Sequence, residues 1–241
     1  MVVKDYCELG KFTLNSSNFI GSELYGLVYK INDTQCLKIF RSNKIIKLLE
    51  KKHPETFLEY LKTLSTKTSS ILVIPEDIYT DKSNLVRTYV SEYQEEIFLN
   101  SNINDIEISR FMKILEEFYL ILSKIEDLVS NDGSPSNLII TNDGVLKMID
   151  LGLSKFEKWM DSDMVQKRNY EILNSSILNA IIRKRNFYDV MDENLIKFVD
   201  ASFSGDYPFP QLLSEYIEYV NRNYIEVKKV KDLRYPYVGS M

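Results

Sequence analysis

The hydrophobic pattern changes its period along the chain, and this constrains the fold most. Between Phe12 and Phe40 the pattern is that of short strands, with a predicted hairpin turn at Asn32-Asp33-Thr34. After Asn104, hydrophobic residues recur at three- and four-residue steps, as on one face of an amphipathic helix: Ile106, Phe111, Ile114, Leu115, Phe118, Leu122 and Ile125. The pattern therefore predicts an α+β chain with two lobes, a β-rich first part and a mainly helical remainder.

Further elements follow from the same periods. A helix is predicted over about residues 43–64, with a break at His53-Pro54 because proline disfavours helix in the preceding residue. Strands are predicted at 71–74, 77–80 and 85–93. A second hairpin is predicted over 138–149, with its turn at Asn142-Asp143-Gly144.

Composition excludes several classes of protein. With 44% hydrophobic and 27% charged residues, the chain is not intrinsically disordered. The net charge of −5 gives no general attraction to nucleic acid or to an anionic membrane. We expect no signal peptide, no spanning segment and reduced thiols at Cys7 and Cys36, hence a cytoplasmic protein or one delivered into a host cell.

Three polar residues are predicted to meet at the open end of the second hairpin. Asn137 precedes its first strand and Asp150 follows its second, so the turn brings them side by side. An amide and a carboxylate oxygen can hold Mg²⁺. Asp132, in the preceding loop, could orient a hydroxyl for attack. The alternative is that each of these side chains caps a turn.

Glycines near the first hairpin form a second candidate site. Gly21 and Gly26 are five residues apart, with Val28 two further on. Glycines let backbone N–H groups approach phosphates closely. A pair of glycines in an ordinary β-turn is the alternative.

Together these motifs resemble the protein-kinase-like superfamily. Asp132-Gly133-Ser134-Pro135-Ser136-Asn137 looks like the catalytic loop D-x-x-P-x-N, and Asp150-Leu151-Gly152 looks like D-F-G with Leu for Phe. The stretch from Ile20 to Val28 resembles the Gly-rich loop, with Glu23 in place of its middle glycine. Cys36-Leu37-Lys38 resembles V-A-I-K. The resemblance covers about residues 12–155, with the elements in the family's order.

This resemblance implies a bilobal kinase-like fold, with residues 1–93 as the N-lobe and 94–241 as a reduced C-lobe. It implies ATP and Mg²⁺ as cofactors. Lys38 would hold the α- and β-phosphates, and Glu59, or as second choice Glu55, would hold Lys38. By the same resemblance, Asn137 and Asp150 would bind the metal and Asp132 would act on the acceptor hydroxyl. The nucleotide would contact Gly21, Gly26, Val28, Cys36, Lys38 and Ile139.

Three functions are compatible with these residues. The first is an ATP-dependent kinase acting on Ser or Thr of a protein substrate, without nucleic-acid or membrane partners. The second is a small-molecule phosphotransferase of the aminoglycoside or choline-kinase type, favoured by the short segment after Gly152 and by Ser134 in place of the lysine of serine/threonine kinases. Ser134 does not match the histidine of aminoglycoside phosphotransferases either. The third is a nucleotide-binding pseudokinase scaffold.

We expect several other residues to have no catalytic or binding role. His53 and the basic tail around Lys228, Lys229 and Lys231 are expected to be solvated. Trp159 is expected to pack inside the protein, and Ser154 to be an ordinary surface residue. Because Asn131 stands where many protein kinases have an arginine that binds a phosphorylated loop, activity should not require phosphorylation after Gly152.

Overall fold

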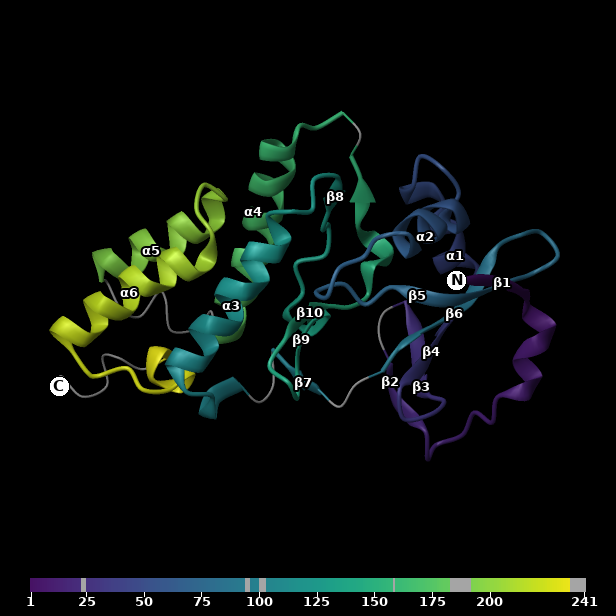
Figure 1. The fold of residues 1–241 in the computed structure, drawn as a ribbon, viewed down its shortest axis with the longest axis horizontal. Coiled ribbons are helices and arrows are strands. Elements are labelled where there is room, and N and C mark those ends of the chain that lie inside the picture. Colours follow the sequence, from purple (N-terminus) through teal and green to yellow (C-terminus); the bar gives the residue numbers. More distant parts are fainter. Residues whose placement is uncertain (23–24, 94–95, 100–102, 158, 183–191, 235–241) are drawn as a thin grey trace. The chain divides into compact units, whose positions relative to one another are not determined.

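The structure is a computed structural model that describes residues 1–22, 25–93, 96–99, 103–157, 159–182 and 192–234 (Figure 1). It combines a β-sheet with α-helices, as the α+β prediction required. The chain divides into two compact units, residues 1–95 with 150–153, and residues 96–149 with 154–241. The division places Asp150 and the three residues after it with the first unit, whereas the sequence interpretation assigned them to the second part.

The first unit contains a six-stranded sheet in the order β1-β5-β6-β4-β3-β2. Its strands are β1 (Val2–Asp5), β2 (Phe19–Ser22), β3 (Gly26–Lys30), β4 (Gln35–Phe40), β5 (Pro75–Thr80) and β6 (Val86–Glu92). β1 runs parallel to β5, and all other neighbours are antiparallel. The predicted β3–β4 hairpin is confirmed, and the Asn32 side chain accepts a hydrogen bond from Thr34 N–H at 2.9 Å in its turn.

In the first unit, one strand was missed and one predicted strand is absent. β1 was not predicted, because a four-residue strand with mainly exposed side chains carries no alternating pattern. Residues 71–74 were predicted as a strand but form none. Ile71 and Leu72 are buried there, and a short hydrophobic run before a proline looks the same whether it is a strand or a buried connection.

The two faces of this sheet are covered by different segments. On one face, Leu37, Tyr79 and Val90 form a buried cluster. The 3-10 helix η1 (Tyr6–Lys11) and the residues after it contribute the partners Leu9, Phe12 and Leu14. On the opposite face, which carries Lys38, the Phe40 ring packs edge-on against Phe57 and Tyr89.

The predicted break at His53-Pro54 is confirmed. Helix α1 (Asn43–Lys52) ends before it and helix α2 (Phe57–Ser65) begins after it. Ser42 and Thr56 cap the two helices by accepting backbone N–H groups. α2 buries Phe57, Leu58, Tyr60, Leu61 and Leu64.

The second unit contains the predicted hairpin of β9 (Leu138–Thr141) and β10 (Leu146–Met148). β7 (Glu96–Phe98) pairs with β9, and β8 (Leu128–Val129) pairs with β11 (Lys155–Phe156). In the turn, Gly144 has φ +87°, a conformation that favours glycine.

Helices form the rest of the second unit: α3 (Ile108–Leu122), α4 (Ser162–Ile181), α5 (Glu193–Ser204) and α6 (Phe209–Asn223), with the 3-10 helices η2 (Ile103–Asp105), η3 (Pro135–Asn137) and η6 (Val230–Arg234). The predicted hydrophobic face of α3 is confirmed, since Phe111, Ile114, Leu115, Phe118 and Leu122 are buried. α5 contacts α4 and α6, and α6 contacts α3.

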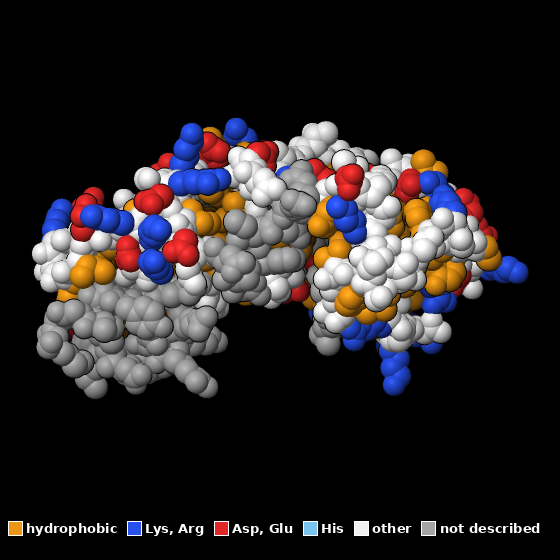
Figure 2. All heavy atoms as spheres, turned by 90° about the horizontal axis from the view of Figure 1, so that it is seen from below, with side chains coloured by type: hydrophobic (Ala, Val, Ile, Leu, Met, Phe, Trp, Pro, Cys, Tyr) orange, Lys and Arg blue, Asp and Glu red, His pale blue; other side chains and the backbone are white. Residues whose placement is uncertain are grey.

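Charged side chains of both signs are interspersed on the face of the molecule seen in Figure 2. Within the basic tail, Lys228 pairs with Glu226 at 2.9 Å, and Lys231 pairs with Asp105 of η2 at 3.1 Å. These ion pairs neutralise part of its charge. None of the helices in the described ranges combines the length and hydrophobicity needed to span a membrane.

Candidate functional site

Two of the predicted site residues form a buried ion pair in the first unit. Lys38, in β4, places its Nζ 2.5 Å from Oδ1 of Asp150. Their side chains are only 6% and 13% exposed. Removing one partner of a buried pair costs about 3–5 kcal/mol because the other charge remains unpaired. Losing either charge alone should therefore destabilise the first unit.

Asp150 also has an unusual backbone conformation. Its φ is +53°, in the left-handed region that only a few per cent of non-glycine residues adopt, Asp and Asn more often than others. Such a residue costs about 1–3 kcal/mol and persists only where surrounding contacts hold it, and such residues cluster at active sites. The 3-10 helix η4 (Leu151–Leu153) follows immediately. The strain and the ion pair thus fall on the same residue.

η4 is held by two side chains, one from the break between α1 and α2 and one from α2. His53 Nε2 lies 3.0 Å from the Gly152 carbonyl oxygen, and the Tyr60 hydroxyl donates to the Leu151 carbonyl at 2.6 Å. The prediction that His53 is solvated was wrong, since it is 5% exposed. The break between α1 and α2 turns the ring inward, where it stacks on Tyr60 with centroids 4.0 Å apart.

The structure does not bring Glu59 to Lys38. Glu59 lies on the exposed face of α2 and forms its ion pair with Lys62 at 2.7 Å. The hydrophobic face of α2 is buried, so position 59 points to solvent. Glu55, the second choice, is exposed and precedes the helix. Asp150 is the ion-pair partner that the structure gives to Lys38 instead of Glu59.

Gly21 and Gly26 differ in how closely their surroundings are packed. A Cβ atom at Gly26 would lie 2.9 Å from the Ile39 carbonyl oxygen and 3.3 Å from the Lys38 side chain. A Cβ at Gly21 would meet nothing within 4 Å. Glu23 lies outside the described residues. Of the two glycines, Gly26 alone is therefore required by close packing, first against the Ile39 carbonyl and then against the Lys38 side chain.

Val28 and Cys36 share the sheet face of Lys38. Val28 is directly opposite Lys38 in the β3–β4 register, and Cys36 is two residues from it along β4. Both side chains are half-buried, and Cys36 Sγ lies 3.4 Å from Ser91 Oγ. This face therefore offers a small hydrophobic surface next to a cation.

Asp132 lies in the second unit, in the loop between β8 and η3. Its Oδ1 accepts the N–H of Ser134 at 3.1 Å, and the Ser134 hydroxyl caps η3. The turn-capping interpretation is thus correct for part of the carboxylate. The side chain is half-buried, so it remains reachable from solvent.

Sequence reasoning missed the residue that anchors this loop. Asn169 of α4 accepts the N–H of Ser130 at 2.8 Å and donates to the Leu128 carbonyl at 2.9 Å. It is 1% exposed. Its signal was a polar residue on the buried face of α4, four residues after Val165 and four before Leu173.

Asn137 lies at the open end of the hairpin, as predicted. Its carbonyl accepts the N–H of Ile149 at 2.9 Å, and Asp150 is the next residue in the chain. Within the described part of the chain, the Asn137 side-chain amide makes no hydrogen bond, although it is half-buried. Ile139, two residues along β9, is 2% exposed.

The Asp150 carboxylate and the Asn137 side-chain amide, predicted to bind Mg²⁺, are both suitable oxygen donors. A carboxylate and an unbonded amide oxygen fit a hard cation that keeps several of its waters. Over the same described ranges, no group of three or more His, Cys, Asp or Glu residues is spaced to hold a metal.

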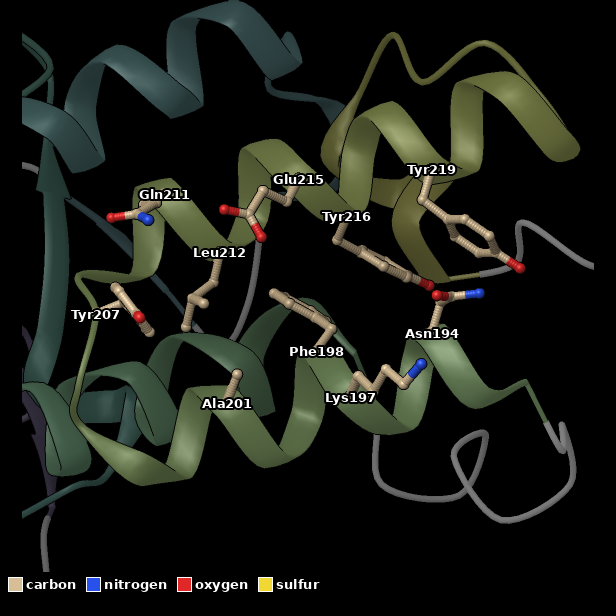
Figure 3. A pocket seen from close by; sticks show the side chains of 10 residues that line it. All are labelled: Asn194, Lys197, Phe198, Ala201, Tyr207, Gln211, Leu212, Glu215, Tyr216 and Tyr219. Atoms are coloured by element: carbon tan, nitrogen blue, oxygen red, sulfur yellow. The ribbon is translucent and has the colours of Figure 1, made fainter.

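A pocket of about 420 Å³ lies elsewhere, between α5 and α6 in the second unit (Figure 3). The rings of Phe198 and Tyr216 stack within it, 4.5 Å apart and parallel within 1°. Lys197 and Glu215 provide its charges. None of the residues predicted for chemistry lines this pocket.

Neither protein-family models nor curated proteins gave a match to this chain. The residue geometry therefore carries the functional argument.

Proposed function

We propose that this protein is an ATP- and Mg²⁺-dependent kinase that transfers the γ-phosphate to a Ser or Thr hydroxyl of a protein substrate. The observation that carries the proposal is the buried Lys38–Asp150 pair, with Asp150 in a left-handed conformation. The close packing of Gly26 against the Ile39 carbonyl and the Lys38 side chain supports it. We further propose that the two units correspond to the lobes of a kinase-like fold.

Lys38 and Asp150 suit a site that binds a polyphosphate and a cation together. Each satisfies the other's charge in the structure. Upon binding, phosphate oxygens would replace the carboxylate at Lys38, and the cation would replace the ammonium at Asp150. Buried charges therefore stay paired before and after binding.

The remaining roles follow from phosphoryl transfer, in which catalysis is mainly positioning and charge neutralisation. Asn137 and Asp150 would hold Mg²⁺, whose positive charge would offset the negative charge of the phosphates. Asp132 would orient the acceptor hydroxyl and take its proton. The acceptor oxygen bonds to the γ-phosphorus, and the bond from that phosphorus to the β–γ bridging oxygen breaks, leaving ADP.

Two kinds of variant test these roles. Asp132→Ala should abolish transfer but keep nucleotide affinity, whereas Asp150→Ala should lose both Mg²⁺ binding and transfer. Asp143→Asn, in the exposed turn of the same hairpin, is the matched control. Calorimetric titration with ATP, with and without Mg²⁺, measures binding, and γ-³²P-labelled ATP measures transfer.

The same assay separates the alternatives. Label on protein in a mixed extract supports the proposal, and label on small molecules alone selects the small-molecule phosphotransferase. Binding without transfer to either selects the pseudokinase scaffold. The proposal fails if neither ATP nor Mg-ATP binds, or if Asp132→Ala transfers phosphate as fast as the parent.

A further inference from the structure

We propose that His53 and Tyr60 form a latch that positions Asp150 for phosphoryl transfer, a role that rests on the proposed function. The latch consists of the two hydrogen bonds from these side chains to the backbone of η4. Both are positioning residues, because they act through the backbone that follows Asp150.

The geometry fixes the direction of both hydrogen bonds. A carbonyl oxygen only accepts, so His53 Nε2 carries the hydrogen that Gly152 receives. The Tyr60 hydroxyl likewise donates to Leu151, at 2.6 Å. Two consecutive carbonyls are thus bound by two buried donors. This arrangement restrains the rotation of the η4 backbone at the residues next to Asp150.

Three nearly parallel rings hold the donors in place. His53 stacks on Tyr60 at 4.0 Å and on Phe57 at 5.3 Å, with interplanar angles of 22° and 27°. Glu50 of α1 accepts the N–H of Phe57 at 3.0 Å, which links the two helices beside the stack. The donors therefore have little rotational freedom.

The Gly152 backbone lies next to both the Asp150 carboxylate and the ring stack: a Cβ atom added at this position would be 3.6 Å from Asp150 Oδ1 and 3.8 Å from the Phe57 ring, which are ordinary van der Waals distances. Because η4 begins directly after Asp150, a shift of η4 would move the carboxylate that pairs with Lys38. Because the left-handed φ of Asp150 persists only where surrounding contacts hold it, losing the latch should release it.

Single-group substitutions test the latch. Tyr60→Phe removes one donor and keeps the ring, and His53→Phe removes the other. His53→Gln places an amide N–H near the position of Nε2 and should restore function. Tyr79→Phe is the matched control, because the buried Tyr79 hydroxyl has no hydrogen-bond partner in the described part of the chain.

The first measurement does not depend on kinase activity. Acetylation of Lys38 by acetic anhydride, followed by mass spectrometry, reports how often the Lys38–Asp150 pair opens. We expect Tyr60→Phe and His53→Phe to be labelled about five-fold faster than wild type, the factor for one lost hydrogen bond. Tyr79→Phe and His53→Gln should be labelled at the wild-type rate.

The second measurement is transfer from Mg-ATP. We expect kcat to fall about five-fold in Tyr60→Phe and His53→Phe, while KM for the acceptor stays unchanged and His53→Gln recovers kcat. If wild type transfers no phosphate, the proposed function fails, and Lys38 labelling alone then decides whether the latch exists. The latch is overturned if Tyr60→Phe and His53→Phe are labelled at the rate of Tyr79→Phe, or if kcat is unchanged in both.

Discussion

Replacing Gly26 with alanine should destabilise the protein, while the same change at Gly21 should not. At Gly26 the new methyl group would lie 2.9 Å from the Ile39 carbonyl oxygen. Carbon–oxygen contacts are ordinarily at least about 3.3 Å, so β3 or β4 must shift. At Gly21 the methyl group would meet nothing within 4 Å.

The magnitude follows from comparing the two variants. Forcing one extra carbon into a packed site costs about 1–3 kcal/mol. Both substitutions also restrict the unfolded chain, which stabilises each by about 0.4–1 kcal/mol where the backbone conformation is compatible. This term cancels in the difference. The free energy of unfolding of Gly26→Ala should therefore be about 1–3 kcal/mol below that of Gly21→Ala.

Urea unfolding followed by circular dichroism measures this difference. With a denaturant slope of about 2 kcal/mol per molar urea, it corresponds to a midpoint lower by about 0.5–1.5 M. Equal midpoints, or a lower midpoint for Gly21→Ala, would show that the approach of β3 to Lys38 is not tight. Because the methyl group also meets the Lys38 side chain, Gly26→Ala should weaken ATP binding more than Gly21→Ala does.

Three further outcomes are expected. Asn169→Leu should lower the free energy of unfolding by about 2–4 kcal/mol in urea titrations, because it leaves the Ser130 N–H and the Leu128 carbonyl buried without partners; a loss below about 0.5 kcal/mol would contradict this. Burial raises the pKa of Asp192, but hydrogen bonds from Tyr219, Tyr224 and two backbone amides outweigh it and hold that pKa below 3.8. Since the pKa of Asp192 is lower in the folded protein than in the unfolded chain, the carboxylate stabilises the protein above pH 3.8 and loses this effect as pH falls through the folded pKa. The difference in free energy of unfolding between wild type and Asp192→Asn should therefore be constant above about pH 5 and shrink below it. A difference that grows on acidification would refute the assignment. Phosphatase-treated protein of confirmed mass should keep its initial rate within about two-fold, because Ser154 is 3% exposed and hence inaccessible to a modifying enzyme; a ten-fold loss restored by re-phosphorylation would disprove this.

In the segment after Asp150, the burial of two side chains was predicted wrongly. Ser154 was interpreted as a surface serine but is buried, and Trp159 was expected to pack inside but is 72% exposed. The indole donates to Glu157 two residues away, at 2.5 Å. Residue type predicts average burial only, and a single turn of the backbone decides which side chain faces inward.

The period of the hydrophobic pattern and the residues typical of turns were sufficient to predict most of the longer helices and hairpins. The β3–β4 hairpin, the β9–β10 hairpin, the break at His53-Pro54 and the buried face of α3 were all predicted, because each depends on residues close together in the chain. The motif residues Lys38 and Asp150 were also found from sequence, and the structure joins them in one ion pair.

Contacts between segments that are distant in the sequence could not be predicted and became visible only in the folded structure. The sequence allowed Glu59 as the partner of Lys38, but burial of the hydrophobic face of α2 turns Glu59 to solvent. His53 looked like a solvated residue, and only the packing of α2 against η4 makes it a buried donor to Gly152. Asn169 reaches its loop across about forty residues in the same way. A polar side chain's partner depends on which backbone groups tertiary packing leaves unpaired beside it, and no local pattern encodes that.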